Sequence, residues 1–428
     1  MIRNASLLDR HKAVLPRWMA LYYDEPISIE RGEGRTVWDG EGRQYLDFFG
    51  GILTTMTGHS VPEVVDAIRD QAAKMLHTST LYLIESQIEL AEKIASLSGI
   101  PDAKVFFTNS GSEANDAALM LATCYRRSNH ILAMRHSYHG RSFATVPVTG
   151  NSSWSPTGLS PFNVSYLHGS YRYRSPFKNL SDVDYINACV DDLKGMIEVS
   201  ASGDIACLIA EPILGVGGFA TPPDGLFGRF KEELDRRGIL FISDEVQTGW
   251  GRTGEAFWGY EPHGFTPDLI TFAKGLGNGL AIGGVVGRPD VIDCFTVNSI
   301  STFGGNPLAM RGALANLQYI EDHGLQENAR VQGAALMSEL KALQRKHPII
   351  GEVRGKGLMI GIEFINPHDG SPSKEKTKRV LEAAKAKGLL LGMGGFYGNV
   401  IRIAPPLSVT DGEVTQALKV IAESVAGA

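Results

Sequence analysis

Three short apolar runs of the sequence each end at an ionisable side chain. The residues that follow these runs are Glu211, Asp244 and Lys274. Any one of them could simply reach solvent from the end of a strand. Burying a carboxylate or an amine costs free energy unless the group has a partner, so three such groups at one edge of a sheet favour a functional site.

Lys274 is the strongest single candidate for catalytic chemistry. A lysine acts as a nucleophile only when it is partly neutral near pH 7, and burial at a strand end lowers its pKa. The glycines at positions 275, 277 and 279 leave space beside it for a ring. Asp244 is a natural partner for a protonated pyridine nitrogen, because such an ion pair keeps the ring electron-withdrawing. The two residues therefore predict pyridoxal phosphate (PLP) as the cofactor.

The phosphate of such a cofactor needs a site of its own, and residues 108–115, Thr-Asn-Ser-Gly-Ser-Glu-Ala-Asn, are a candidate. They lie between a predicted strand and a predicted helix. Ser110 followed by Glu113 fits a capping box, and Gly111 and Ser112 expose backbone N–H groups where the helix begins. The alternative is a helix that is merely well capped, since many helices of α/β proteins begin in this way.

The elements that must position these residues are suggested by short apolar runs alternating with amphipathic stretches. Strands are expected at residues 105–107, 130–134, 205–210, 239–243, 268–273 and 284–287, and helices at 112–127 and 226–237. Buried strands that alternate with helices predict an α/β fold with a mostly parallel sheet. Ligands of such sheets bind beyond the carboxyl ends of the strands, where the three ionisable residues are found.

The two ends of the chain have a different pattern from the middle. A small meander is expected around residues 36–38 and 45–47, within an N-terminal segment of residues 1–60. The segment 326–428 is expected to hold helices at 326–346 and 374–387, strands at 357–364 and 400–403, and a last helix with Asp411 as its N-cap. The predicted plan is a large domain at 61–325 and a smaller α+β domain built from both terminal segments.

The composition narrows the classes of function. Hydrophobic residues make up 43% and charged residues 21% of the 428 residues, as is usual for a globular protein with a core. A net charge of −6 without a basic cluster argues against nucleic-acid binding. The four cysteines lack metal-ligand spacing, and no apolar run reaches the ~20 residues that span a bilayer. We therefore expect a cytoplasmic protein that binds no nucleic acid, membrane or metal.

At these positions the chain resembles the class III, or ω-amino-acid type, PLP aminotransferases. The similar stretches are residues 50–52, 58–59, 109–115, 138–141, 211–212, 244–249, 274–275, 302–307 and 354–358. Each stretch alone is a weak signal, but their order, with Lys274 placed 30 positions after Asp244, makes a specific set. The resemblance runs nearly from end to end and implies the PLP-transferase fold of type I.

The resemblance implies roles for individual residues around the cofactor. Lys274 would form the Schiff base and later move a proton, and Asp244 would pair with the pyridine nitrogen. Further contacts with the cofactor are implied for Ser110, Gly111, Ser112, Tyr138, His139, Val246, Gln247 and Thr302. Thr302 would reach the phosphate from the neighbouring subunit. A homodimer, or a dimer of dimers, with shared active sites is therefore expected.

Substrate-binding residues are implied in the same way. Arg402 resembles the arginine that grips the α-carboxylate of the substrate, for which its planar fork is suited. Glu211 resembles the switch residue that pairs with this arginine when a substrate has no α-carboxylate. Arg141 matches a position that binds the distal carboxylate in aminobutyrate-type members, and Ile52 is implied to contact the substrate.

The C-terminal half is most similar to the alanine–glyoxylate type 2 and β-amino-acid–pyruvate branch of the family. The expected reaction moves an amino group from an ω- or β-amino acid, or alanine, to a 2-oxo acid such as pyruvate or glyoxylate, in a ping-pong mechanism. Arg141 is more typical of the aminobutyrate branch, so 4-aminobutyrate with 2-oxoglutarate stays an alternative. An aminomutase, a decarboxylase or a racemase of the same fold is a further one.

Two unrelated interpretations are less well supported. Residues 215–220, Gly-Val-Gly-Gly-Phe-Ala, fit a dinucleotide-binding fingerprint, but Thr-Pro-Pro-Asp follows where that fingerprint needs a helix. His136 and His139 have a spacing compatible with a metal site near Asp244 and Glu245, yet the sequence indicates no third ligand.

Overall fold

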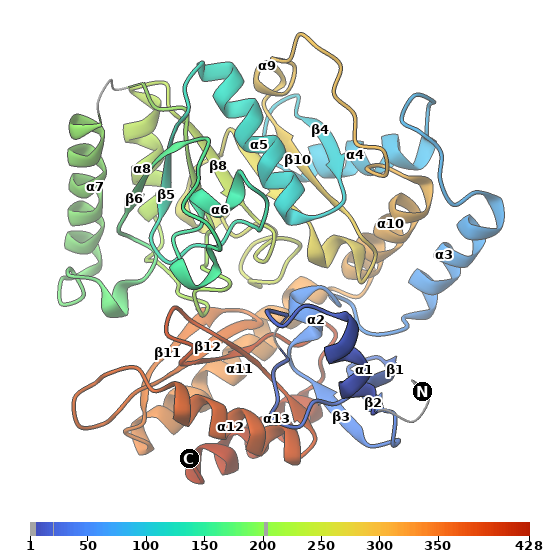
Figure 1. The fold of residues 1–428 in the computed structure, drawn as a ribbon, viewed down its shortest axis with the longest axis vertical. Helices are drawn as coiled ribbons and strands as arrows, with labels where there is room; N and C mark the ends of the chain where they lie inside the picture. Colours follow the sequence, from blue (N-terminus) through green and yellow to red (C-terminus); the bar gives the residue numbers. More distant parts are fainter. Residues whose placement is uncertain (1–5, 20, 201–203) are drawn as a thin grey trace.

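The computed structural model describes residues 6–19, 21–200 and 204–428. Figure 1 shows a large part, in which helices cover a central sheet, and a smaller part below it to which both ends of the chain belong. Among the residues described, no helix is both long enough and apolar enough to cross a bilayer.

The large part is built on a seven-stranded sheet with the order β4-β10-β9-β8-β7-β5-β6. The strands are β4 Lys104–Thr108, β5 His130–Met134, β6 Asn163–Leu167, β7 Cys207–Ala210, β8 Leu240–Asp244, β9 Leu269–Phe272 and β10 Gly283–Gly287. Strands β5 to β9 pair in parallel, whereas β10 runs antiparallel to both β4 and β9. The expected α/β fold with a mostly parallel sheet is confirmed.

Both faces of this sheet are covered, which explains why its central strands are apolar at nearly every position. Ile131 of β5 packs on the side of helix α5 (Gly111–Arg126). Its neighbour Leu132 points the other way and packs with α7 (Asp182–Val199) and α8 (Leu226–Asp235). The other helices of the large part are α3 Pro62–Lys74, α4 Glu85–Leu97, α6 Thr145–Val148, α9 Pro289–Ile292 and α10 Pro307–Asp322.

The smaller part combines the N-terminal and C-terminal segments in two sheets, with the orders β1-β2-β3-β13 and β11-β12-β15-β14. The strands are β1 Ile29–Glu33, β2 Thr36–Asp39, β3 Gln44–Asp47, β11 Ile350–Lys356, β12 Met359–Phe364, β13 Leu389–Leu390, β14 Gly392–Gly394 and β15 Val400–Ile403. The helices are α1 Leu7–Val14, α2 Gly50–Leu53, α11 Leu325–Lys346, α12 Lys374–Ala386 and α13 Asp411–Ala426. Because β13 pairs in parallel with β3, segments from both ends of the chain share one sheet.

Some details differ from the sequence-based expectations. The N-cap of α13 is Thr410 and not Asp411, because the Thr410 hydroxyl accepts from the Glu413 amide while the Glu413 carboxylate accepts from the Thr410 amide. Asp411 is the first helical residue, where its charge still favours the helix N-terminus. Strands β6 and β11 are not evident in the sequence, because polar residues and glycines interrupt their apolar pattern.

A buried cluster of charges joins the two parts of the molecule. Glu363 on β12 accepts from Arg354 Nη1 at 2.6 Å and from Arg174 Nε at 2.7 Å, and its side chain is fully buried. Tyr171 also donates to Glu363, and Asn399 Nδ2 lies 3.2 Å from it. Arg174 and Tyr171 belong to the large part. The cluster therefore ties the chain just before β15 to the large part.

We expect Glu363→Gln to lower the midpoint of urea unfolding, because the neutral amide leaves the partly buried guanidinium of Arg174 without its anion, while Arg354 keeps only its pair with Glu352. Breaking a buried ion pair in this way costs about 3 kcal/mol. The matched control is Glu375→Gln, which removes an exposed pair with Arg379 and should leave the midpoint unchanged. Equal shifts in the two variants would contradict a structural role for the Glu363 cluster.

Candidate active site

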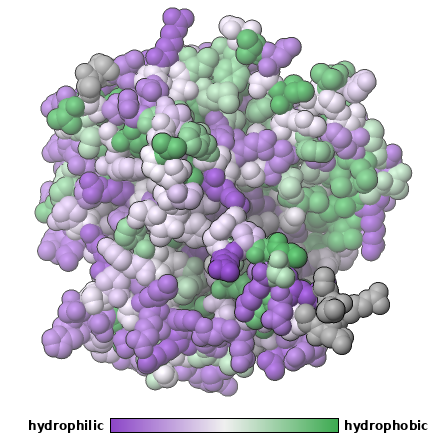
Figure 2. Space-filling view, in the orientation of Figure 1, coloured by the Kyte–Doolittle hydropathy of each residue, from purple (hydrophilic) through white to green (hydrophobic). Residues whose placement is uncertain are grey.

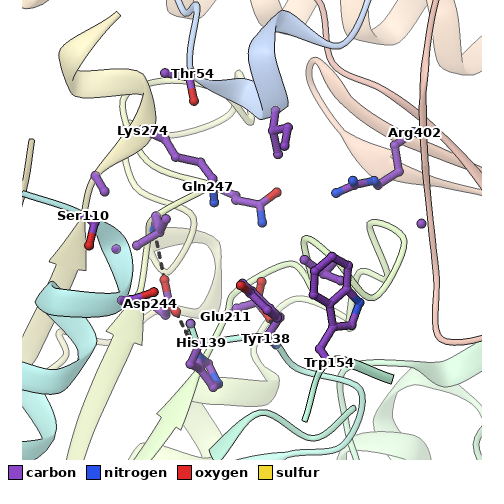
Figure 3. A pocket seen from close by; sticks show the side chains of 18 of the residues that line it. Thr54, Ser110, Tyr138, His139, Trp154, Glu211, Asp244, Gln247, Lys274 and Arg402 are labelled. Atoms are coloured by element: carbon purple, nitrogen blue, oxygen red, sulfur yellow. Dashed lines mark hydrogen bonds and ion pairs between the residues drawn. The ribbon is translucent and has the colours of Figure 1, made fainter. Parts of the chain in front are cut away.

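A cavity of about 850 Å³ lies between the carboxyl ends of the large sheet and the smaller part of the molecule. Figure 3 shows labelled side chains converging on it, with Arg402 reaching in from the side opposite Lys274. Of the residues implied by the sequence, those that line it are Ile52, Ser110, Gly111, Ser112, Tyr138, His139, Glu211, Asp244, Val246, Gln247, Lys274 and Arg402. This is the place where mostly parallel sheets bind their ligands.

Lys274 opens the short helix η4 (Lys274–Gly277), close behind the end of β9. Its backbone has a φ of +40°, in the left-handed region, which costs a residue with a Cβ about 1–2 kcal/mol. Burial lowers the pKa of its amine from 10.5 to about 8, although the charges of Asp244 and Glu211 act in the opposite direction. An amine with this pKa is partly neutral near pH 7 to 8, as a nucleophile requires.

Asp244 is the last residue of β8, and three donors fix its carboxylate. Oδ2 accepts from His139 Nδ1 and from Asn115 Nδ2, both at 2.7 Å, and Oδ1 accepts from the Val246 amide at 3.1 Å. Figure 3 shows His139 beneath the carboxylate on the side away from Lys274. Asn115 is itself fixed, because its Oδ1 accepts from the hydroxyl of Thr271 at 2.6 Å. The carboxylate therefore has a single preferred orientation.

The first turn of α5 lies at the cavity and resembles an anion site. The N-cap Ser110 accepts from the Glu113 amide at 3.3 Å, which is half of the expected capping box. The other half differs from the expectation, because the Glu113 carboxylate accepts from the Asn109 amide at 2.9 Å. A Cβ added at Gly111 would lie 2.9 Å from the side chain of Val246, so a larger residue there would have to displace Val246. The N–H groups and dipole of this helix start suit a phosphate.

Glu211 and Arg402 line the same cavity without pairing. Glu211 Oε1 accepts from the Tyr138 amide at 2.9 Å and Oε2 from the Gly215 amide at 2.8 Å. Burial raises the pKa of Glu211 to about 7. Among the residues described, the donors of Arg402 reach only neutral acceptors. The ion pair of the proposed switch is thus not formed in this arrangement, and the switch stays a prediction.

The remaining lining residues shape the space between these groups. Tyr138 packs edge-on against Trp154, with ring centroids 5.3 Å apart. Gln247 Oε1 is buried without a hydrogen-bond partner, as expected of an atom that meets a ligand. Ile52 has a φ of +66° and belongs to a left-handed turn, Gly50–Leu53, that borders the cavity.

Two of the implied residues lie outside the cavity of this chain. Arg141 is exposed, and its guanidinium lies 5.4 Å from the ring of Trp18. Thr302 is exposed in the segment before α10. Neither lines the cavity. The predicted contact of Thr302 with a neighbouring subunit's phosphate is consistent with this placement, and it stays a prediction.

The geometry supports neither the dinucleotide-binding fingerprint nor the metal site considered from the sequence. Residues 215–220 form a loop closed by a bridge between Leu214 and Ala220, and the next helix begins only at Leu226. His136 packs 4.8 Å from the ring of Phe396. Within the described ranges, no three His, Cys, Asp or Glu residues gather where they could hold a metal.

Two residues that contact Asp244 and Arg402 were given no role of their own from the sequence. Asn115 carried a usable signal, because it is a polar residue about one helical turn after Gly111 and so faces the same way. Tyr22 carried none. Its phenol reaches Arg402 across 380 positions of sequence, which no spacing rule anticipates.

The residues of the cavity fit PLP. Lys274 offers a partly neutral amine and Asp244 a fixed carboxylate for a ring nitrogen. The unpartnered Oε1 of Gln247 offers a polar contact for the ring, and the start of α5 offers N–H groups for a phosphate.

Comparisons with known proteins agree with this fit. Residues 19–425 match the family model described as aminotransferase class-III. The chain is 40% identical over 410 residues to alanine–glyoxylate aminotransferase 2 homolog 2 of Arabidopsis thaliana, covering 94% of this chain and 84% of that protein. It is 37% identical over 431 residues to 5-aminovalerate aminotransferase DavT of Pseudomonas aeruginosa, covering 98% of each.

A comparison with solved structures also finds a PLP-dependent transaminase. A PLP-bound amine transaminase from an uncultivated Pseudomonas species matches with a TM-score of 0.90 at 29% identity, covering 97% of this chain and 98% of that one. The fold expected of a type I PLP enzyme is therefore confirmed. Taken with the family match over residues 19–425, this shows that the chain belongs to the class III aminotransferases, which are PLP-dependent enzymes.

Proposed function

We propose that Lys274 attaches PLP through its Nζ, that Asp244 pairs with the ring nitrogen and that the start of α5 binds the phosphate. The lowered pKa of the lysine and the three donors to the aspartate support these roles. When bound, PLP supplies an electron sink for the substrate carbon that bears the amino group. The negative charge of Asp244 favours a protonated ring nitrogen, on which that sink depends.

We propose that Lys274 also moves protons and that the other residues of the cavity hold the ring and Asp244 in position. With a pKa of about 8, Lys274 Nζ can both accept and donate a proton near neutral pH, which suits proton transfer at the substrate carbon. Tyr138 and Val246 are proposed to pack on the two faces of the ring, and Gln247 to hydrogen-bond its hydroxyl. His139 is proposed to hold Asp244 in place from the protein side.

For the substrates we propose an ω- or β-amino acid, or alanine, as donor and a 2-oxo acid such as pyruvate or glyoxylate as acceptor. The observation that carries this proposal is Arg402, a cation in the cavity without an anionic partner among the residues described. Its fork of N–H donors suits a planar carboxylate. The second candidate, 4-aminobutyrate with 2-oxoglutarate, is favoured by the similarity to a 5-aminovalerate aminotransferase.

We expect the rate at which the apoprotein attaches PLP to rise with pH through about 8, because the neutral amine of Lys274 is the reacting form. Stopped-flow absorbance measures this rate, and mass spectrometry after borohydride reduction identifies the modified lysine. Lys274→Ala should yield no modified peptide. A midpoint near 10.5, the usual pKa of lysine, or a modified lysine elsewhere would contradict the assignment.

We expect Arg402→Ala to lower kcat/KM for pyruvate about 100-fold, since a charge-assisted pair with the carboxylate is lost. The half-reaction with a carboxylate-free amine should change far less. Arg330→Ala, which alters an exposed arginine on α11, is the control. Equal losses in both half-reactions would refute the role of Arg402.

The variant Arg141→Ala tests the second candidate. A loss of activity confined to 4-aminobutyrate and 2-oxoglutarate would favour that candidate.

We further propose that the protein acts as a homodimer, alone or as a dimer of dimers. Figure 2 shows apolar side chains gathered at the right of the molecule, over α3, α4 and the chain that joins them. The large apolar residues exposed in this region and in the loop before α10 are Met75, Leu76, Leu81, Tyr82, Leu83, Ile88, Val297, Ile300 and Phe303. The two segments meet, since the rings of His77 and Phe303 are 5.2 Å apart. An apolar surface of this kind favours a subunit interface.

We expect Leu83→Asp to shift the protein toward monomers and to reduce its activity, because Leu83 is 94% exposed in the single chain and a charge there would oppose burial in an interface. The matched control is Val183→Asp, at an exposed apolar position on α7 at the far side of the molecule. Sedimentation velocity measures the oligomeric state. An unchanged oligomer for Leu83→Asp, or equal effects of both variants, would exclude this surface.

A cytoplasmic location is also part of the proposal. Its support is that the four cysteines, Cys124, Cys189, Cys207 and Cys294, are free thiols, as is usual in a reducing compartment.

A further inference from the structure

Arg402 is held in place by neighbours that do not neutralise it. Nη1 donates to the Gly215 carbonyl and Nη2 to the Met393 carbonyl, both at 3.3 Å. The rings of Phe49 and Phe219 lie 4.7 Å and 5.5 Å from the guanidinium carbon. Nε is buried and has no hydrogen-bond partner. The side chain is thus fixed by aromatic rings and carbonyls, and its charge remains available to an anion in the cavity.

Tyr22 brings a hydroxyl to the same guanidinium from the N-terminal segment. Its Oη accepts from Arg402 Nη2 at 3.3 Å, and the residue lines the cavity. Its ring packs against Phe49, with centroids 5.7 Å apart and an interplanar angle of 40°. Phe49 therefore supports both the arginine and the tyrosine, and it holds the phenol beside the guanidinium.

The Tyr22 hydroxyl uses only its acceptor function in this arrangement. A phenol also has one O–H donor, and that donor meets no acceptor among the residues described. A carboxylate has about four acceptor positions, so it can accept from Arg402 and from a further donor at the same time. An alkyl group in the same place would leave the O–H donor unpaired, which costs binding free energy.

We infer that Tyr22 is a specificity-determining residue, which donates to the substrate carboxylate held by Arg402 and so favours 2-oxo acids over carbonyl compounds without a carboxylate. This inference rests on the proposed role of Arg402. Because Tyr22 acts at the carboxylate end of the substrate, it contributes to substrate binding. Its removal should therefore raise KM and leave kcat nearly unchanged.

Tyr22→Phe tests this inference, because it removes the hydroxyl and keeps the ring that packs on Phe49. With the holoenzyme, the KM for pyruvate should rise about tenfold, the usual effect of one hydrogen bond to a charged group, with kcat nearly unchanged. The kcat/KM for propanal, which has no carboxylate, should not fall. The Kd of propionate, which cannot react, should rise by the same factor as the KM for pyruvate.

Tyr23→Phe is the matched control. Tyr23 is the next residue, but its ring lies 4.9 Å from the amine of Lys385 and it does not line the cavity, so its variant should behave as the wild type. Unchanged affinity for propionate in Tyr22→Phe, or equal losses with pyruvate and propanal, would overturn the inference. Failure of the wild-type protein to aminate pyruvate would instead refute the proposed function, while the propionate measurement would still test Tyr22.

Discussion

A buried amine and a buried carboxylate at one edge of the large sheet impose most of the other requirements on this structure. Removing both groups from water costs free energy that neighbouring groups must offset. For Asp244 the compensation is three hydrogen-bond donors, which come from His139, Asn115 and the backbone of Val246. For Lys274 the cost is smaller because burial lowers the pKa of its amine to about 8, so the amine carries a positive charge for only part of the time near neutral pH. The positions of helix α5 and of the turn after β5 therefore depend on their hydrogen bonds to Asp244 as well as on core packing.

The smaller part of the molecule supplies the opposite wall of the cavity. Arg402 on β15 is the only one of the sequence-implied substrate residues that comes from the C-terminal segment, and it is supported by Phe49 from the N-terminal one. The pairing of β13 with β3 joins the two segments, and the Glu363 cluster ties the chain before β15 to the large part. The position of the arginine relative to Lys274 thus depends on contacts between regions that are far apart in the sequence.

Much of the site could be predicted because it lies at strand ends and at a helix start, which are local features. Asp244 and Lys274 come at the ends of apolar runs, and Ser110 precedes an amphipathic stretch. These local patterns are enough to predict where each residue lies in the fold. The contact of Tyr22 with Arg402 could not be predicted, since it depends on how two segments 380 positions apart approach one another. Strand β6 was also missed, because its five residues include two polar ones and its place in the sheet depends on pairing with β5. Arg141 and Thr302 were implied by resemblance alone, and the single chain leaves both outside its own cavity.

An aminotransferase differs from a racemase or an aminomutase of the same fold in keeping the amino group between two half-reactions. The most direct test adds excess amino donor to the purified holoenzyme with no oxo acid present and counts the carbonyl product per subunit. We predict one product molecule per Lys274, after which the reaction stops until a 2-oxo acid such as pyruvate is added. Continuous formation of any product from the donor alone would contradict the account.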